Sequence, residues 1–270
     1  MNIMDLDRNY LTVVCTSNTK YLQYVFPFFE SLNKNCKDIN IVIRLVNDNT
    51  LFKKYQNLNI YTIYDKVKLQ DDIILNDKDI KEYNYEELTN IIKNNNLGNS
   101  IFKKREAIYC SNIKFNTINF LLNNNFKHIL YLDVDTIVRE DINCIIKETK
   151  NNDLAMFIDE NDIDDFITKH NERYIGLNAG FMYLNNTKKS KIFYKELEKR
   201  VKDDFYDLDA DEVEFQKLLK ESDISIKFVD KKYKDNGPKY ENESLMWSGQ
   251  SDEKILNNLF KEEKLLYDRT

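Results

Sequence analysis

Short apolar runs alternate with segments of helical pattern along most of this chain of 270 residues. The runs at 11–15, 39–46 and 128–132 have the length and β-branched content of buried strands. Amphipathic stretches such as 103–122 lie between them. Parallel strands need long crossover connections, usually helices, so this alternation favours a mainly parallel, mixed sheet flanked by helices. We therefore expect an α/β fold.

The remaining elements follow the same pattern. Further strands are expected at 59–64, 154–158, 181–184 and 225–229, and helices at 21–33, 85–93, 187–202, 211–220 and 251–266. Pro27 would delay or kink the first of these helices, and Thr16, Ser17 and Asn18 suit a polar turn after the first strand. The chain has only 5 Gly and 2 Pro and shows no internal repeat or linker, which indicates one domain over 1–270.

Charge and composition exclude several classes of protein. The net charge is −6 and no long basic run occurs, which argues against nucleic-acid binding. No stretch approaches 18 apolar residues, so no membrane span is expected. The 4 cysteines lie far apart without a CxxC pair, and the N-terminal residues lack a secretory pattern. We expect a reduced, cytoplasmic protein.

A pair of carboxylates is the most informative motif. Asp133 and Asp135 directly follow the apolar run 128–132, at the end of a strand where open α/β folds bind their ligands. Side chains at i and i+2 point the same way on an extended backbone, so both can reach one Mn or Mg ion. Such a cation would typically neutralise a phosphate or pyrophosphate. A solvated acidic turn is the alternative.

Four segments together resemble a known family. They are LTVVCTSNTKYLQYVFPFFESL at 11–32, HILYLDVDTIVREDI at 128–142, GLNAGF at 176–181 and DEVEFQ at 211–216. In this order they resemble the opening strand, metal-binding strand, "NAGF" segment and "DQxxLN" helix start of the glycogenin-like glycosyltransferases of family 8 and related retaining enzymes with a GT-A fold.

The resemblance implies a single, Rossmann-like GT-A domain with a nucleotide-binding half at about 1–138 and an acceptor and sugar half at about 139–270. It further implies metal-dependent transfer of a hexose from a nucleotide-sugar, a UDP-sugar, to a hydroxyl of a saccharide or protein, with retention of configuration. Mn or Mg would be the cofactor.

The resemblance also implies site residues. The donor would contact Thr16, Ser17, Tyr21, Arg105, Asp133, Val134, Asp135, Trp247, Ser248 and Lys254. Asn178, Asp211 and Glu212 would act on the sugar, and Asp133 and Asp135 would hold the metal. Most of these residues have a plainer alternative: a polar turn and core tyrosine for the first three, solvated charges for Arg105 and Lys254, a turn into a buried strand for Asn178, and helix-start stabilisation for Asp211 and Glu212.

The chain departs from the family near its end. Family 8 usually has "HxxGxxK", whose His is the third metal ligand, whereas this chain has Ser248, Ser251 and Lys254 at those positions. Ser248 is the candidate third ligand. The region also resembles, more loosely, clostridial glucosylating toxins, with Glu241, Ser244 and Trp247 as counterparts. We expect 248–254 to form a mobile loop and helix start over the diphosphate.

Two other functions fit parts of the sequence. Residues 133–137 nearly match the nucleophile motif DxDx[TV] of haloacid-dehalogenase-like phosphatases, with Asp133 as nucleophile and Ile137 as the mismatch. That family usually places the motif near the start of its fold, whereas about 130 residues precede it here. A non-catalytic carbohydrate- or protein-binding module is the other alternative.

Overall fold

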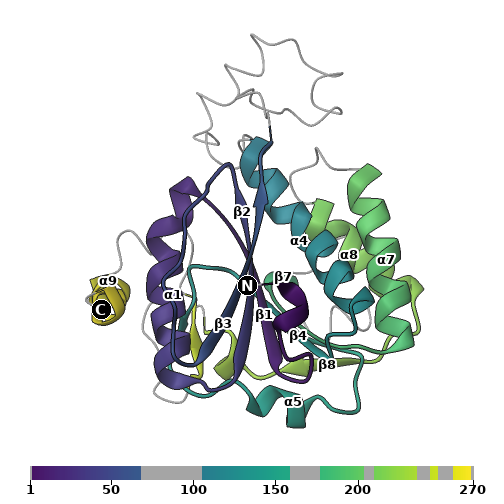
Figure 1. Ribbon diagram of the computed structural model, residues 1–270. Helices are drawn as coiled ribbons and strands as arrows, with labels where there is room; N and C mark the ends of the chain where they lie inside the picture. Colours follow the sequence, from purple (N-terminus) through teal and green to yellow (C-terminus); the bar gives the residue numbers. More distant parts are fainter. Residues whose placement is uncertain are drawn as a thin grey trace, which may run out of the picture.

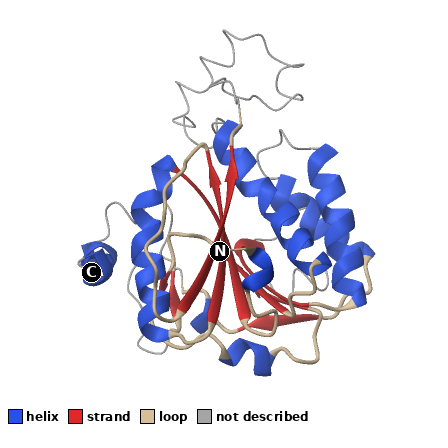
Figure 2. Cartoon of the chain, in the orientation of Figure 1, coloured by secondary structure: helices blue, strands red, loops and turns tan. Residues whose placement is uncertain are grey.

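The computed structural model describes residues 2–67, 105–158, 177–203, 210–235, 244–248 and 258–268. In this part of the chain, a central twisted sheet lies between helices on both faces (Figure 1). The expected α/β fold is confirmed, and the layers are plain when the cartoon is coloured by secondary structure (Figure 2).

The main sheet of the described residues has seven strands in the order β3-β2-β1-β4-β7-β6-β8. β1 pairs in parallel with β2 and β4, β2 with β3, and β6 with β8, whereas β7 runs antiparallel to β4 and β6. The strands are β1 (Leu11–Asn18), β2 (Ile39–Val46), β3 (Leu58–Asp65), β4 (His128–Leu132), β6 (Leu154–Ile158), β7 (Leu177–Asn185) and β8 (Ile226–Val229). The parallel set β3-β2-β1-β4 brings four carboxyl ends to one edge.

Each face of the sheet has its own apolar core, because successive side chains of a strand point to opposite faces. On one face, Val13 and Cys15 of β1 pack with Phe28 and Phe29 of α1 (Leu22–Asn35). On the other face, Val14 belongs to a cluster supplied by α4 (Arg105–Asn123), α7 (Lys188–Asp203) and α8 (Ala210–Glu221). Fully burying one such apolar side chain stabilises the fold by roughly 1.5–3 kcal/mol, which holds both helical layers in place.

A second, two-stranded sheet lies beside α1. It pairs β5 (Ile137–Val138), which follows the carboxylate pair, antiparallel with β9 (Met246–Trp247). The C-terminal helix α9 (Asn258–Asp268) packs on the outer side of α1 (Figure 1). The remaining short helices are η1 (Ile3–Asp5), η2 (Thr19–Tyr21), α5 (Cys144–Glu148) and η3 (Lys231–Tyr233).

The expected elements recur with small shifts in their bounds. Two expectations were wrong. The polar residues 16–18 continue β1, because its parallel pairing with β2 extends to Asn18 and Val46. Pro27 does not delay α1, which already begins at Leu22, since burial of the surrounding apolar side chains outweighs one missing backbone hydrogen bond. A kink at Pro27 stays a prediction. The helix expected at 85–93 lies outside the described residues, as does the start of the one expected at 251–266.

Candidate functional site

The carboxyl edge of the parallel strands brings together the first polar residues singled out from the sequence. Val14 of β1 is paired with Tyr131 of β4. Both strands run on toward the same edge of the sheet, β1 into Thr16 and β4 into Asp133. The charge of Asp133 adds to burial, the larger cause, in raising the pKa of the neighbouring Cys15 thiol. β1 and the carboxylate motif therefore share one site.

The two carboxylates lie in a tight turn that follows β4. The Asp133 amide donates to the Gly180 carbonyl of β7 at 3.2 Å, and the Thr136 amide donates to the Asp133 carbonyl at 3.2 Å. Val134, between the two, is buried in the core on the α1 face. The Asp133 side chain is 46% exposed, so its carboxylate faces outward from a backbone that is fixed on both sides.

Two tyrosines lie within electrostatic reach of the carboxylates. The rings of Tyr21 and Tyr24 lie 6.1 Å apart, and Tyr21 is 38% exposed. Burial, followed by the negative charge of Asp135, raises the pKa of both phenols. The negative charge of Asp135 therefore acts on both phenols. An aromatic surface beside two carboxylates suits a ligand with a planar ring and a cation-bound anion.

Two buried hydroxyl groups meet next to the turn. Thr136 Oγ1 and Ser248 Oγ lie 3.2 Å apart, and both side chains are buried. Among the described residues, no three His, Cys, Asp or Glu side chains gather as a metal site. Mg²⁺ is commonly held by only one or two carboxylates, with substrate phosphate and water as the other ligands. Asp133 and Asp135 fit that donor set, with a hydroxyl available nearby.

Lys234 is a residue that the sequence analysis missed. Its ammonium group lies 3.9 Å from Asp133 Oδ2, although its side chain is only 3% exposed. It follows η3, far from the carboxylate motif in sequence, and nothing in the local KKYK pattern distinguishes it from its neighbours. A buried cation at this position adds positive charge where an anionic ligand would approach.

Lys114 is a second residue that was missed, and it holds the predicted Asp211. Lys114 Nζ donates to Asp211 Oδ2 at 2.8 Å and to the Ala179 carbonyl at 3.4 Å. It also lies 5.1 Å from the ring of Tyr131, whose hydroxyl donates to Asp133 at 3.4 Å. This buried ion pair therefore joins α4, α8 and β7 immediately behind the carboxylates. Lys114 shares a helical stripe with buried apolar residues of α4, a signal that could have identified it.

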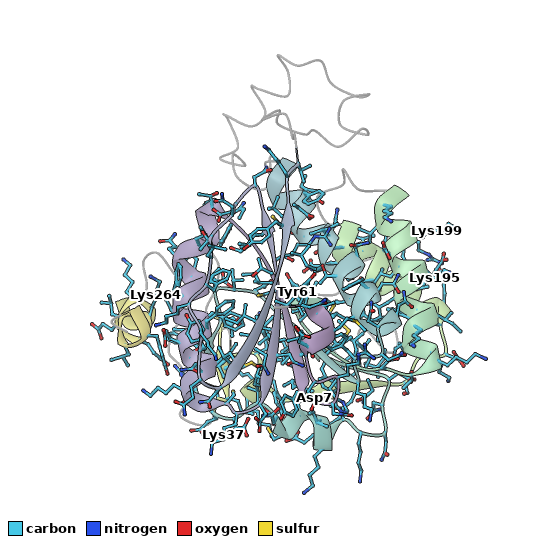
Figure 3. All side chains as sticks on the ribbon, in the orientation of Figure 1. Asp7, Lys37, Tyr61, Lys195, Lys199 and Lys264 are labelled. Atoms are coloured by element: carbon cyan, nitrogen blue, oxygen red, sulfur yellow. The ribbon has the colours of Figure 1, made fainter. Side chains whose placement is uncertain are left out.

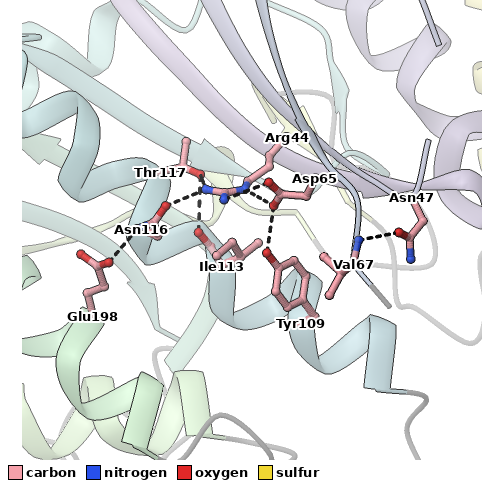
Figure 4. A network of polar contacts seen from close by, with 9 residues as sticks. All are labelled: Arg44, Asn47, Asp65, Val67, Tyr109, Ile113, Asn116, Thr117 and Glu198. Carbon is pink, nitrogen blue, oxygen red and sulfur yellow. Dashed lines mark hydrogen bonds and ion pairs between the residues drawn. The ribbon is translucent and has the colours of Figure 1, made fainter. Parts of the chain in front are cut away.

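The opposite face of α4 is anchored by a polar network (Figure 4). Arg44 of β2 forms two hydrogen bonds with Asp65, at 2.5 and 3.1 Å, and one with Asn116 of α4 at 2.7 Å. Tyr109 of α4 donates to the same Asp65 carboxylate at 3.0 Å. The side-chain amide of Asn116 in turn donates a hydrogen bond to Glu198 of α7 at 2.7 Å. Charged groups thus fix α4 on both faces, which holds Lys114 in position.

The other predicted residues occupy varied positions. Thr16 and Ser17 are buried, and Thr16 Oγ1 has no hydrogen-bond partner among the described residues. Glu212 is partly buried in the first turn of α8, beside Asp211. Trp247 is fully buried with Ile137 and Tyr267. Its contact with a donor stays a prediction, as do the roles of the other residues.

Several predicted residues cannot be placed. The side chains of Arg105 and Asn178 lie outside the described residues, although their backbones belong to α4 and β7. Glu241 and Lys254 also lie outside, and so does the segment 249–254 of the expected loop.

The two lysines of the site, Lys114 and Lys234, differ from surface lysines in their burial. Lys195 and Lys199, which Figure 3 labels, project from the exposed face of α7 away from the sheet. Lys114 and Lys234 are both 3% exposed. In the described part of the chain, no helix has the length and apolar character needed to cross a membrane.

Comparison with known proteins gives one family. The model of the nucleotide-diphospho-sugar transferase family matches residues 72–261, more than half of the chain. The match includes the carboxylate pair, Lys114, Asp211 and Ser248. None of the curated proteins compared by sequence matches this chain.

Solved structures share the fold. The glycosyltransferase GlyE of Streptococcus pneumoniae TIGR4 superposes with a TM-score of 0.54 at 13% identity, over 95% of this chain and 60% of that one. Its apo form gives a TM-score of 0.56 with the same identity and coverage. This chain thus spans about 60% of GlyE. Mouse xyloside xylosyltransferase 1 in its apo form gives 0.48 at 12% identity, over 90% of this chain and 98% of that one.

Proposed function

The chain belongs to the nucleotide-diphospho-sugar transferases, and we propose that it moves one hexose from a UDP-sugar to a hydroxyl of a saccharide or protein. The glycosyl transfer itself follows from the family. The sugar, the uridine base, the metal dependence and the retained configuration are parts of the proposal that rest on the resemblance of the motifs to family 8.

The observation that carries the proposal is the outward-facing carboxylate turn at the end of β4. Asp133 is fixed by backbone hydrogen bonds on both sides, and Lys234 lies 3.9 Å from its carboxylate. A cation bound there by Asp133 and Asp135 would neutralise the diphosphate and so stabilise the departing nucleotide. Lys234 would add a fixed positive charge on the same side.

The protein residues would divide the other tasks. Thr16, Ser17 and Tyr21 at the end of β1 would hold the nucleoside, with the exposed Tyr21 ring as a surface for the base. Asp211, oriented by Lys114 at 2.8 Å, would accept hydrogen bonds from sugar hydroxyls. Asn178, two residues before Gly180, would contact the same sugar.

The phosphatase alternative requires Asp133 to attack phosphorus and form a phospho-aspartate. Membership in the transferase family favours a binding role for this carboxylate instead.

The test is a screen of nucleotide-sugars against the full chain, with and without Mn²⁺ or Mg²⁺. Donor at 100 times its dissociation constant should stabilise the fold by about 2.7 kcal/mol, which a melting curve detects. We expect stabilisation by a UDP-sugar only with the cation, and slow release of UDP. Absence of both effects with every nucleotide-sugar contradicts the proposal, and a trapped phospho-aspartate supports the phosphatase.

A further inference from the structure

One arginine joins the segment around β9 to the C-terminal helix. Arg139, which follows β5, donates from Nε and Nη2 to the two carboxylate oxygens of Glu263 in α9, each at 2.6 Å. Its Nη1 donates to Ser244 Oγ at 2.8 Å. Its guanidinium carbon lies 4.9 Å from the centre of the Trp247 ring. A single side chain therefore contacts three residues from two different parts of the chain.

These contacts are largely shielded from solvent and well matched in geometry. The side chains of Arg139 and Glu263 are 11% and 14% exposed. A forked guanidinium–carboxylate pair is among the stronger polar interactions, and its planar donor group also stacks on an aromatic ring. Removal of one partner leaves the other charge buried, which makes the contact hard to replace.

The segment held in this way contributes to the candidate site. The Arg139 amide donates to the Leu245 carbonyl at 2.9 Å, and the Ser248 amide donates to the Asp235 carbonyl at 2.8 Å. Between these two bonds, β9 pairs with β5 and Trp247 is fully buried. The next residue, Ser248, meets Thr136 at 3.2 Å, beside the carboxylate pair.

We propose that Arg139 is a positioning residue for the metal site. It clamps Trp247 between β5 and α9, and thereby fixes Ser248 beside Thr136, without touching donor or metal itself. The consequence for turnover rests on the proposed function, whereas the clamp itself does not.

Trp247 is the only tryptophan of the chain, so its fluorescence reports on the clamp directly. Arg139→Met and Glu263→Gln should shift the emission to longer wavelength and make it several-fold easier to quench with acrylamide. Arg139→Lys keeps the charge but not the forked geometry, and should lie between these variants and the wild type. Arg200→Met, which removes another paired arginine on α7, is the matched control and should leave the emission unchanged.

A role in stability alone would move the emission without affecting the metal. We therefore measure the Mn²⁺ concentration for half-maximal donor hydrolysis. Arg139→Met should raise it roughly tenfold, as loss of an outer-shell contact does. In a Ser248→Ala background, the same change should add little, because the residue through which Arg139 acts is already altered.

The outcomes separate cleanly. Wild-type emission in Arg139→Met and Glu263→Gln overturns the clamp. The positioning role is overturned if the emission shifts while the Mn²⁺ midpoint is unchanged. It is also overturned if Arg139→Met raises the Mn²⁺ midpoint as much in the Ser248→Ala background as in the wild type. If wild-type protein turns over no nucleotide-sugar, the proposed function fails, and Trp247 emission still decides the clamp. Should Arg139→Met fail to fold, Arg139→Lys and Glu263→Gln provide the same comparisons.

Discussion

Thr136 and Ser248 face each other with their hydroxyl oxygens 3.2 Å apart, although 112 residues separate them in the chain. The contact brings the end of the carboxylate motif against the segment where this chain departs most from family 8. Because Thr136 directly follows Asp135 in the chain, the contact supports the proposal that Ser248 is the third metal ligand.

Ser248→Ala should weaken metal binding and leave the fold intact, because only one small buried hydroxyl is removed. If Ser248 reaches the cation, directly or through water, the metal concentration for half-maximal turnover should rise roughly tenfold. Ser222→Ala removes a hydroxyl that donates to the Leu219 carbonyl in α8, and serves as the control. An unchanged metal midpoint in Ser248→Ala assigns the third ligand elsewhere.

Asp135→Asn should abolish metal-dependent turnover. The loss should reach at least roughly a hundredfold, because an outer-shell partner alone can cost that much in metal affinity. Asp38→Asn is the matched control. Asp38 immediately precedes β2, away from the carboxyl ends of the strands, and has a φ of 55°, a conformation that Asn tolerates as well as Asp. Steady-state kinetics over a range of Mn²⁺ concentrations and a melting curve test both variants. Wild-type turnover by Asp135→Asn contradicts the metal assignment.

Local pattern was sufficient to predict most of the main sheet and the carboxylate turn. The runs at 39–46, 128–132 and 154–158 match β2, β4 and β6 residue for residue, because each is a continuous buried strand. β5 and β9 have two residues each, too few for any periodicity, and were missed. The polar end of β1 was misassigned as a turn, because strand pairing with β2 overrides local preference there.

Contacts between distant residues explain what the sequence analysis missed in the site. Lys114 and Asp211 are 97 residues apart, and their pairing depends on how α4 and α8 pack on the sheet. Asp211 was singled out only through the resemblance, without its partner. Lys234 meets Asp133 because the chain returns to the carboxylate turn after β8, which no single segment of sequence indicates.

Breaking the Lys114–Asp211 pair should destabilise the fold. Lys114→Met leaves the Asp211 carboxylate buried without its cation, which should lower the free energy of unfolding by about 3–5 kcal/mol. The double variant Lys114→Met, Asp211→Leu should recover part of this loss, because no charge then stays buried. Urea unfolding of the single and the double variant measures the loss and its recovery.

The exposed pair Lys189–Asp223 provides the contrast for this experiment. Lys189→Met should change the free energy of unfolding far less than Lys114→Met does, because solvent screens an exposed ion pair. Equal losses of unfolding free energy for Lys114→Met and Lys189→Met would contradict the buried state of the Lys114–Asp211 pair.

His128 should make the protein less stable in mild acid. Burial, the main cause, lowers the pKa of His128 below the ordinary value of 6.5. The hydrogen bond that Asn185 Oδ1 accepts from the ring opposes this shift, and the charge of Lys127 adds to it. As the pH falls through about 6.5, the unfolded chain therefore binds a proton before the folded one does, and the folded state loses stability. Above that pH both forms are neutral and the contribution is nil. His128→Gln should flatten the difference in urea-unfolding free energy between about pH 7.5 and pH 5.5. An NMR titration that places the His128 pKa at or above 6.5 in the folded protein contradicts this explanation.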